Sequence, residues 1–177
     1  MARVPDITNR EQLPEAQRWA FDEIVGSRGS VRGPFKALLH SPELGSRAGK
    51  LGAYLRFESE ATLPPRMREL SALIGARLLD CGYEYAAHRQ LAGDAGVSDA
   101  EWTAIREYRR EGLPEGDRWL YDFVEQLIQK HRVDDATFAQ AKQRLSDQGV
   151  VELVANVGYY AFLAMTLNTF QIEPADV

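Results

Sequence analysis

The chain has 177 residues and a formal net charge of −5, with 45% hydrophobic and 27% charged residues. This length suits one domain with a substantial core, and we expect that domain to span residues 1–177. The acidic balance and the lack of a basic stripe argue against a nucleic-acid partner. The single cysteine excludes an intrachain disulfide and favours a reducing compartment. No apolar segment typical of a signal peptide begins the chain, so we predict a soluble, cytoplasmic protein.

The pattern of apolar residues, prolines and glycines predicts an all-α helical bundle of roughly seven or eight helices. Helical segments are expected over residues 14–25, 34–40, 42–55, 66–79, 83–95, 101–109, 114–130, 136–146 and 150–167. The last segment is the most apolar, but Glu152 and Asn156 interrupt it. We therefore expect a buried core helix there and no membrane span.

One stretch of the sequence recurs a hundred residues later. Leu13-Pro14-Glu15-x-x-Arg18-Trp19-x-x-Asp22 is matched by Leu113-Pro114-Glu115-x-x-Arg118-Trp119-x-x-Asp122. Two explanations are open: both stretches are efficient helix starts, or they descend from an old duplication. Either explanation concerns the fold and not the function.

The residues best suited to chemistry lie near the middle of the chain. On a helix, Cys81 and Glu84 are three residues apart and Glu84 and His88 are four apart, so the three side chains would line one stripe. A thiol, a carboxyl group and an imidazole in one line could pass a proton and activate the sulfur. If a new helix begins near residues 80–82, Cys81 lies in its first turn, where the partial positive charge of the helix favours a thiolate.

Glu69 is a further candidate, but one straight helix would not bring it to this stripe. On such a helix Glu69 and Cys81 would be roughly 18 Å apart and about 120° out of phase. Glu69 therefore joins the cluster only if the chain bends near Gly75 or residues 80–82, or if a neighbouring subunit supplies it.

The run from Glu69 to His88 resembles the core of the carboxymuconolactone decarboxylase family, which includes the alkylhydroperoxidase D proteins. The peroxidase branch carries a glutamate, then a Cys-x-x-Cys pair twelve residues on, then a histidine four residues further. Here Glu69, Cys81 and His88 fall on those positions, and Glu84 replaces the second cysteine. Cys-Gly-Tyr-Glu-Tyr-Ala-Ala-His also resembles the Tyr-Glu-Trp-x-x-His signature of the decarboxylase-like branch. The core of the resemblance covers residues 63–109.

The resemblance implies an alkylhydroperoxidase D-like helical fold that assembles as trimers or hexamers. A dithiol peroxidase reduces peroxide with one thiol and resolves the sulfenic acid with the other. Because Cys81 is the only cysteine, that cycle cannot close within one subunit, although a one-cysteine variant could use an external thiol.

The decarboxylase-like branch implies a different use of these residues. Loss of carbon dioxide from a carboxymuconolactone needs a proton donor for carbon and a cation that holds a substrate carboxylate. His88 is the natural proton carrier near neutral pH, and Glu84 and Glu69 could orient it or shift its pKa. The candidates for substrate binding are Arg66, Arg77, Arg89 and His40. This chemistry calls for no metal and no organic cofactor.

The primary hypothesis is thus a carboxymuconolactone decarboxylase-like enzyme that acts on a small carboxylated lactone or related organic acid, with His88 as acid and base. The alternative is a thiol-dependent alkyl hydroperoxide reductase with Cys81 as nucleophile and a Glu69–His88 proton relay. A third hypothesis is a non-catalytic oligomeric helical protein. Tyr159 and Tyr160 are expected in the core or at a subunit interface.

Overall fold

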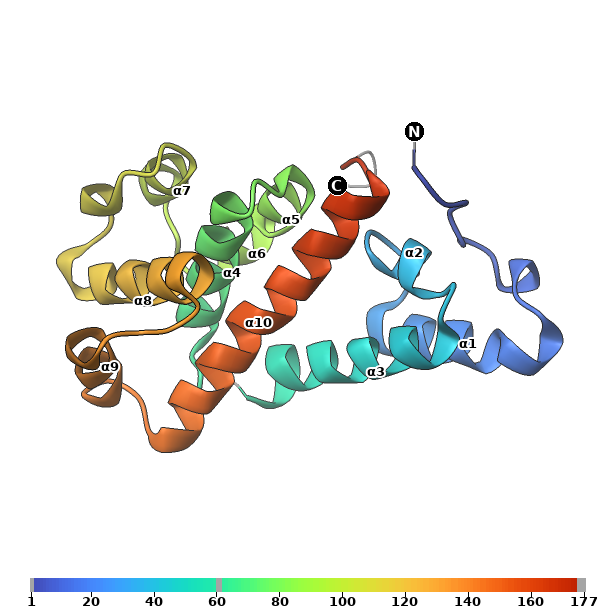
Figure 1. The fold of residues 1–177 in the computed structure, drawn as a ribbon, viewed down its shortest axis with the longest axis horizontal. Coiled ribbons are helices and arrows are strands. Elements are labelled where there is room, and N and C mark those ends of the chain that lie inside the picture. The colour runs from blue at the N-terminus through green and yellow to red at the C-terminus, as the bar shows by residue number, and fades with distance from the viewer. Residues whose placement is uncertain (1, 60–61, 175–177) are drawn as a thin grey trace.

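A computed structural model describes residues 2–59 and 62–174, which form ten α-helices and no strand (Figure 1). The all-α prediction is confirmed. The helices are α1 (Arg18–Arg28), α2 (Phe35–Leu38), α3 (Pro42–Ala53), α4 (Pro65–Leu78), α5 (Gly82–Ala87), α6 (Arg89–Asp94), α7 (Asp99–Arg106), α8 (Arg118–Lys130), α9 (Asp135–Lys142) and α10 (Asp147–Phe170). A π-helical turn, Tyr54–Glu58, extends α3.

The helix count exceeds the expected seven or eight partly because the segment expected over residues 83–95 is divided. His88 has a ψ of −2°, away from the usual helical value, and it separates α5 from α6. The nine segments expected to be helical, with this one divided in two, account for the ten helices. Two backbone hydrogen bonds meet at His88: its N–H donates to the Glu84 carbonyl, and its carbonyl accepts from the Ala92 N–H.

Helix α10 crosses the molecule diagonally between two groups of helices (Figure 1). On one side it packs against α4, α5 and α9, and on the other against α2 and the π-helical turn. Helix α1 packs on α3, and α4 packs on α8. One large hydrophobic cluster accordingly joins α4, α8 and the first half of α10, and a second joins α1 to α3 with the second half of α10.

The middle of helix α4 is deeply enclosed in the fold. All its residues from Glu69 to Ala76 are buried. Leu70, Leu73 and Ile74 are spaced to form one apolar side of the helix, and α10, α8 and α5 all pack against α4. A helix in this position has few places for a charged side chain, so a buried Glu69 needs a partner within the protein.

Helix α10 is the core helix that the sequence predicted, extended at both ends. Among the described residues it is the one helix long and apolar enough to cross a membrane, but 61% of its most apolar 18-residue window is buried inside the molecule. Its two interrupting polar residues are paired. Glu152 accepts a hydrogen bond from the Tyr54 hydroxyl at 2.6 Å, and Asn156 donates to Ser71 at 2.9 Å.

The enclosure of α4 leads to a stability prediction. Leu73 is fully buried, so Leu73→Ala should leave a cavity and lower the free energy of unfolding by about 2–5 kcal/mol. Leu44, which is 45% exposed on α3, provides the control, and Leu44→Ala should change it by less than about 1 kcal/mol. Urea denaturation measures both values, and an equal loss for the two variants would contradict the packing described for α4.

Candidate active site

A sharp bend between α4 and α5 assembles the candidate site. Helix α4 ends at Leu78, Asp80 adopts a left-handed conformation with φ of 51°, and α5 begins at Gly82. Aspartate tolerates this conformation better than most residues. The bend folds α5 back against α4 and brings His88 to Glu69. The chain therefore bends near residues 80–82, and the Glu69–His88 contact forms within one chain.

Three side chains form a buried relay. The Nδ1 atom of His88 lies 2.6 Å from Oε2 of Glu69, and its Nε2 atom lies 3.4 Å from Oε2 of Glu84. All three residues are buried, with exposed fractions of 2% for Glu69, 5% for Glu84 and 6% for His88. The Tyr160 ring meets the imidazole edge-on, with 4.6 Å between the ring centroids. The imidazole is thus held from three sides.

The electrostatics of this relay favour a charged His88–Glu69 pair. Burial lowers the pKa of His88, but hydrogen bonds to Glu69 and Glu84 outweigh burial and raise this pKa to about 9. Burial raises the pKa of Glu69, yet the hydrogen bond and charge of His88, together with the charge of Arg68, bring that pKa below its usual value. At neutral pH the site accordingly holds an imidazolium next to an ionised Glu69.

The relay opens into a cavity of about 400 Å³, called here the main cavity. Glu84 and His88 lie in its wall, together with residues 28–30 and 32–35, Arg56, and Tyr159 and Tyr160 of α10. Tyr83 closes another side. Its ring packs against Gly33, where a Cβ atom would come within 2.9 Å of the ring, and Gly33 has a positive φ of 52°.

Cys81 lies apart from the main cavity. Its backbone is extended at the N-cap of α5, so the helical spacing that would align it with Glu84 does not apply. The side chain is 1% exposed and belongs to a small apolar cluster with Ala164 and Leu167. It lines a separate pocket of about 130 Å³. Burial raises the pKa of the Cys81 thiol to about 11, although backbone N–H groups at the start of α5 favour the thiolate.

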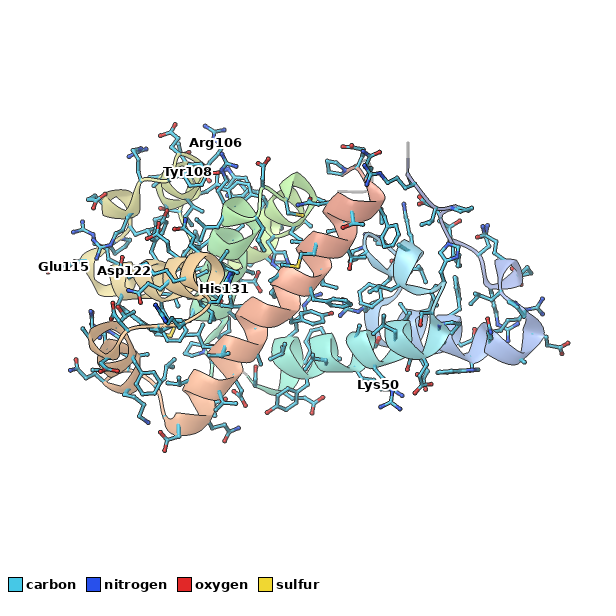
Figure 2. The ribbon with its side chains drawn as sticks, in the orientation of Figure 1. Lys50, Arg106, Tyr108, Glu115, Asp122 and His131 are labelled. Carbon is cyan, nitrogen blue, oxygen red and sulfur yellow. The ribbon has the colours of Figure 1, made fainter. Side chains whose placement is uncertain are left out.

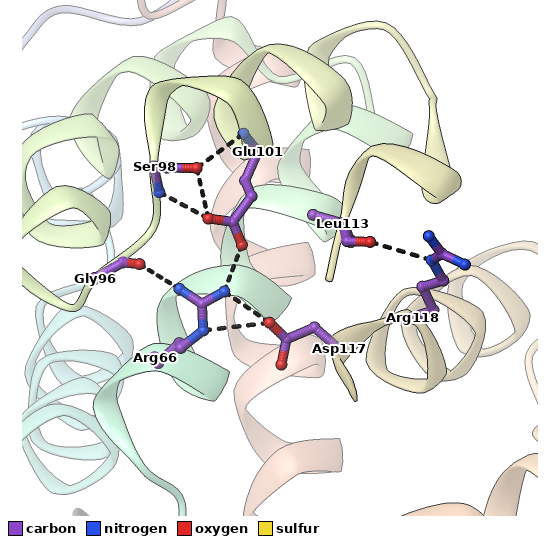
Figure 3. A network of polar contacts seen from close by, with 7 residues as sticks. All are labelled: Arg66, Gly96, Ser98, Glu101, Leu113, Asp117 and Arg118. Atoms are coloured by element: carbon purple, nitrogen blue, oxygen red, sulfur yellow. Dashed lines mark hydrogen bonds and ion pairs between the residues drawn. The ribbon is translucent and has the colours of Figure 1, made fainter. Parts of the chain in front are cut away.

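Arg66 is engaged far from the main cavity, in a network of structural ion pairs (Figure 3). Its guanidinium pairs with Asp117 at 2.6 Å and also with Glu101, and it donates to the carbonyl of Gly96. Glu101 in turn caps α7 through Ser98. This arrangement joins α4, α7 and the segment before α8.

The other basic residues suggested by the sequence also lie outside the main cavity. Arg77 donates to the Arg106 carbonyl at 2.8 Å and pairs with Asp80. Arg89 pairs with Asp99 and lies over the Trp102 ring. The exposed His40 contacts the Pro5 carbonyl at 2.8 Å. The structure therefore gathers Glu69, Glu84 and His88 but not the four residues considered for substrate binding.

Sequence reasoning missed several residues of the cavity wall. Arg28 is the last residue of α1, Arg56 lies in a π-helical turn, and neither belongs to a recognisable motif. Tyr159 and Tyr160 were expected in the core or at an interface, and both are buried but also line the main cavity. Within the described ranges no three His, Cys, Asp or Glu side chains are arranged to hold a metal ion.

Residues 42–110 match the model of the carboxymuconolactone decarboxylase family. A search of curated proteins found no significant match. Among solved structures, the alkylhydroperoxidase AhpD core of an uncharacterized peroxidase-related protein from Ralstonia eutropha JMP134 is 20% identical, with a TM-score of 0.79 over 99% of this chain and 93% of that chain.

Two further solved structures share the fold. A cysteine-to-alanine variant of the debrominase Bmp8 in complex with 2,3,4-tribromopyrrole is 15% identical, with a TM-score of 0.76 over 99% of this chain and 94% of that chain. A protein of unknown function from Agrobacterium tumefaciens, described as a candidate antioxidant defence protein AhpD, is 16% identical, with a TM-score of 0.68 over 80% of this chain and 97% of that chain. These similarities establish the alkylhydroperoxidase D-like fold.

The raised pKa of His88 predicts how stability depends on pH. Since the folded-state pKa of about 9 exceeds the ordinary 6.5, the stabilisation is complete below pH 6.5 and is lost as the pH rises through about 9. Over this range the wild type should lose roughly 3 kcal/mol of unfolding free energy relative to His88→Gln. Chemical denaturation at a series of pH values measures this difference, which would stay constant if His88 were not charged in the folded protein.

The burial of Cys81 predicts a slow and alkaline alkylation reaction. The rate of reaction with iodoacetamide should rise with pH toward an apparent pKa near 11. Rapid reaction with an apparent pKa below the ordinary value of about 8.5 would instead identify an activated thiolate. Mass spectrometry of the intact chain follows this modification directly, because the chain has one cysteine.

Proposed function

We propose that this chain is an acid–base enzyme of the decarboxylase-like branch; the match of residues 42–110 to the carboxymuconolactone decarboxylase family model and the fold shared with AhpD-like structures support this proposal. Its substrate is a small carboxylated lactone or a related organic acid. One observation carries the proposal: the Glu69–His88–Glu84 relay opens into the main cavity, whereas Cys81 does not line that cavity. The cavity volume of about 400 Å³ suits a small organic molecule.

His88 supplies the proton in this mechanism. The bond between the substrate carbon and its departing carboxylate breaks, carbon dioxide leaves, and the electron pair delocalises toward the lactone carbonyl. The imidazolium of His88 then protonates the carbon, which requires the charged form that its pKa of about 9 maintains at neutral pH. His88 regains its proton from water that enters the cavity.

The two glutamates have different positions and hence different roles. Glu69 contacts the imidazole atom that points into the core, so it fixes the ring orientation and stabilises the imidazolium. Glu84 lies in the cavity wall beside Nε2, where it faces both His88 and the substrate. Glu84 therefore directs the transferable proton, whereas Glu69 acts as a positioning residue.

The test is decarboxylation of carboxylated lactones by the wild type and by matched histidine variants. His88→Gln should lower kcat by about 10²- to 10⁴-fold because the proton donor is lost. Glu69→Gln should shift the alkaline limb of the pH profile to lower pH because the imidazolium loses its stabilising charge. His131→Gln is the control, since His131 is an exposed residue that follows α8 (Figure 2). Full activity in His88→Gln would overturn the proposal.

A second candidate function is thiol-dependent reduction of a hydroperoxide through Cys81. Its supporting observation is the small pocket that reaches the thiol between Arg77 and Arg106. The thiol would take one peroxide oxygen to form a sulfenic acid and release an alcohol. Two molecules of an external thiol would then reduce the sulfenic acid, forming a disulfide and water. Peroxide consumption that persists in Cys81→Ser would exclude this function.

We also propose that the protein acts in the cytoplasm as a homo-oligomer, a trimer or a hexamer. The solvent-facing side of α10 supports an assembly because it exposes apolar side chains, Val151, Val154 and Met165 among them. A wild-type protein that turns over neither class of substrate would favour the non-catalytic alternative.

A further inference from the structure

Three arginines line the main cavity, and one of them, Arg32, is exposed to solvent. The other two lack the carboxylate partners that arginines elsewhere in the fold possess. Arg28 and Arg56 are both partly buried, and neither forms an ion pair within residues 2–59 and 62–174. By contrast, Arg66, Arg89 and Arg110 each pair with an aspartate. Unpaired guanidinium groups that are partly shielded from water favour an anion as their partner.

Arg28 is held firmly in place and still has an unused donor. Its Nη2 atom donates to the Tyr159 hydroxyl at 2.9 Å, and its guanidinium lies 4.3 Å from the centre of the Phe35 ring. Its Nε atom is buried and has no hydrogen-bond partner among the described residues. A buried N–H group without an acceptor is costly, so an acceptor supplied by a ligand would relieve that cost.

A glycine on α3 makes room for this arrangement. A Cβ atom at Gly52 would overlap both the Arg28 guanidinium and the Tyr159 hydroxyl. Gly52 lies within a helix, where glycine is less favourable than alanine by roughly 1 kcal/mol. The chain thus carries a helix-weakening residue at the one place on α3 that faces the Arg28–Tyr159 pair.

A row of aromatic rings connects this pair to the relay. The Tyr159 and Tyr160 ring centroids are 5.4 Å apart, and the Tyr160 ring contacts His88. Arg56 lies close enough for its charge to act on both tyrosines. A small molecule in the main cavity can accordingly meet arginine at one side and His88 at the other.

We propose that Arg28 and Arg56 form an anion subsite that binds a carboxylate which the substrate retains through the reaction. The departing carboxylate belongs near His88 and not at this subsite, because pairing it with two cations would stabilise the ground state and slow its loss. For a decarboxylation the preferred substrate is therefore a dicarboxylate. The preference for a dicarboxylate rests on the proposed function, whereas the anion subsite itself does not.

The subsite is tested by binding of two matched probes, measured by isothermal titration calorimetry. Butyrolactone carboxylate carries the five-membered ring and one carboxylate, and butyrolactone is the same ring without it. The wild type should bind the carboxylate at least about tenfold more tightly. Arg28→Gln and Arg56→Gln should each remove most of that preference without changing the affinity for butyrolactone.

Control variants separate the subsite from folding and from catalysis. Arg47→Gln removes an exposed arginine of α3 outside the main cavity and should leave both affinities unchanged. Gly52→Ala should weaken carboxylate binding by displacing Arg28, with no change of charge. Equal affinities for the two probes in the wild type, or an unchanged preference in both arginine variants, would overturn the proposal.

The results also distinguish failure of the subsite from failure of the proposed function. If the carboxylate preference depends on Arg28 and Arg56 but no lactone is decarboxylated, the subsite is supported and the proposed reaction is refuted. If a lactone is decarboxylated but the wild type shows no carboxylate preference in binding, the proposed reaction is supported and the subsite is refuted. Where a dicarboxylate substrate turns over, Arg28→Gln should raise KM about tenfold or more with little change in kcat. This result is expected because the subsite binds the substrate and the transition state equally well.

Discussion

The hydrogen bond between Glu69 and His88 is the interaction on which the central architecture depends. Glu69 lies on α4, the helix that is enclosed on all sides, where an unpaired carboxylate would be strongly destabilising. His88 provides the partner, and it reaches Glu69 because the chain reverses at Asp80 and leaves α5 against α4. The same contact raises the pKa of His88 and so sets the charge of the candidate active site. One buried pair thereby links the topology of the middle of the chain to its chemistry.

The arginines divide according to what surrounds them. Arg66 joins α4 to α7 and to the segment before α8 through carboxylates and a backbone carbonyl, and such partly buried networks hold elements in register. Arg28 instead contacts a tyrosine hydroxyl and an aromatic ring, neither of which neutralises its charge. The difference arises because α10 brings the Tyr159 hydroxyl, and not a carboxylate, within hydrogen-bond distance of Arg28. Helix α10 therefore contributes to both the hydrophobic core and the polarity of the cavity.

The repeated stretch shows what identical local sequence can and cannot specify. In both copies the leucine carbonyl accepts a hydrogen bond from the following arginine, at 3.2 Å for Arg18 and 3.1 Å for Arg118, and short 3₁₀ turns precede the helix. The first copy nevertheless leaves Trp19 40% exposed, whereas Trp119 in the second copy is 2% exposed. Local hydrogen bonds depend on neighbouring residues and recur with them. Burial depends on what packs against the helix, and the two copies have different neighbours.

The sequence by itself determined the helical class, the positions of most helices and the buried character of α10, because these follow from periodicity and from contacts between residues close in the chain. It also singled out Glu69, Glu84 and His88 through spacing and family resemblance. Only the tertiary structure decided that Cys81 lies outside the main cavity and that Arg28 and Arg56 line it in place of Arg66. Those outcomes depend on the left-handed turn at Asp80 and on the path of α10 across the molecule. A side chain's distance from residues far along the chain is set by how the helices pack, and no local pattern encodes that distance.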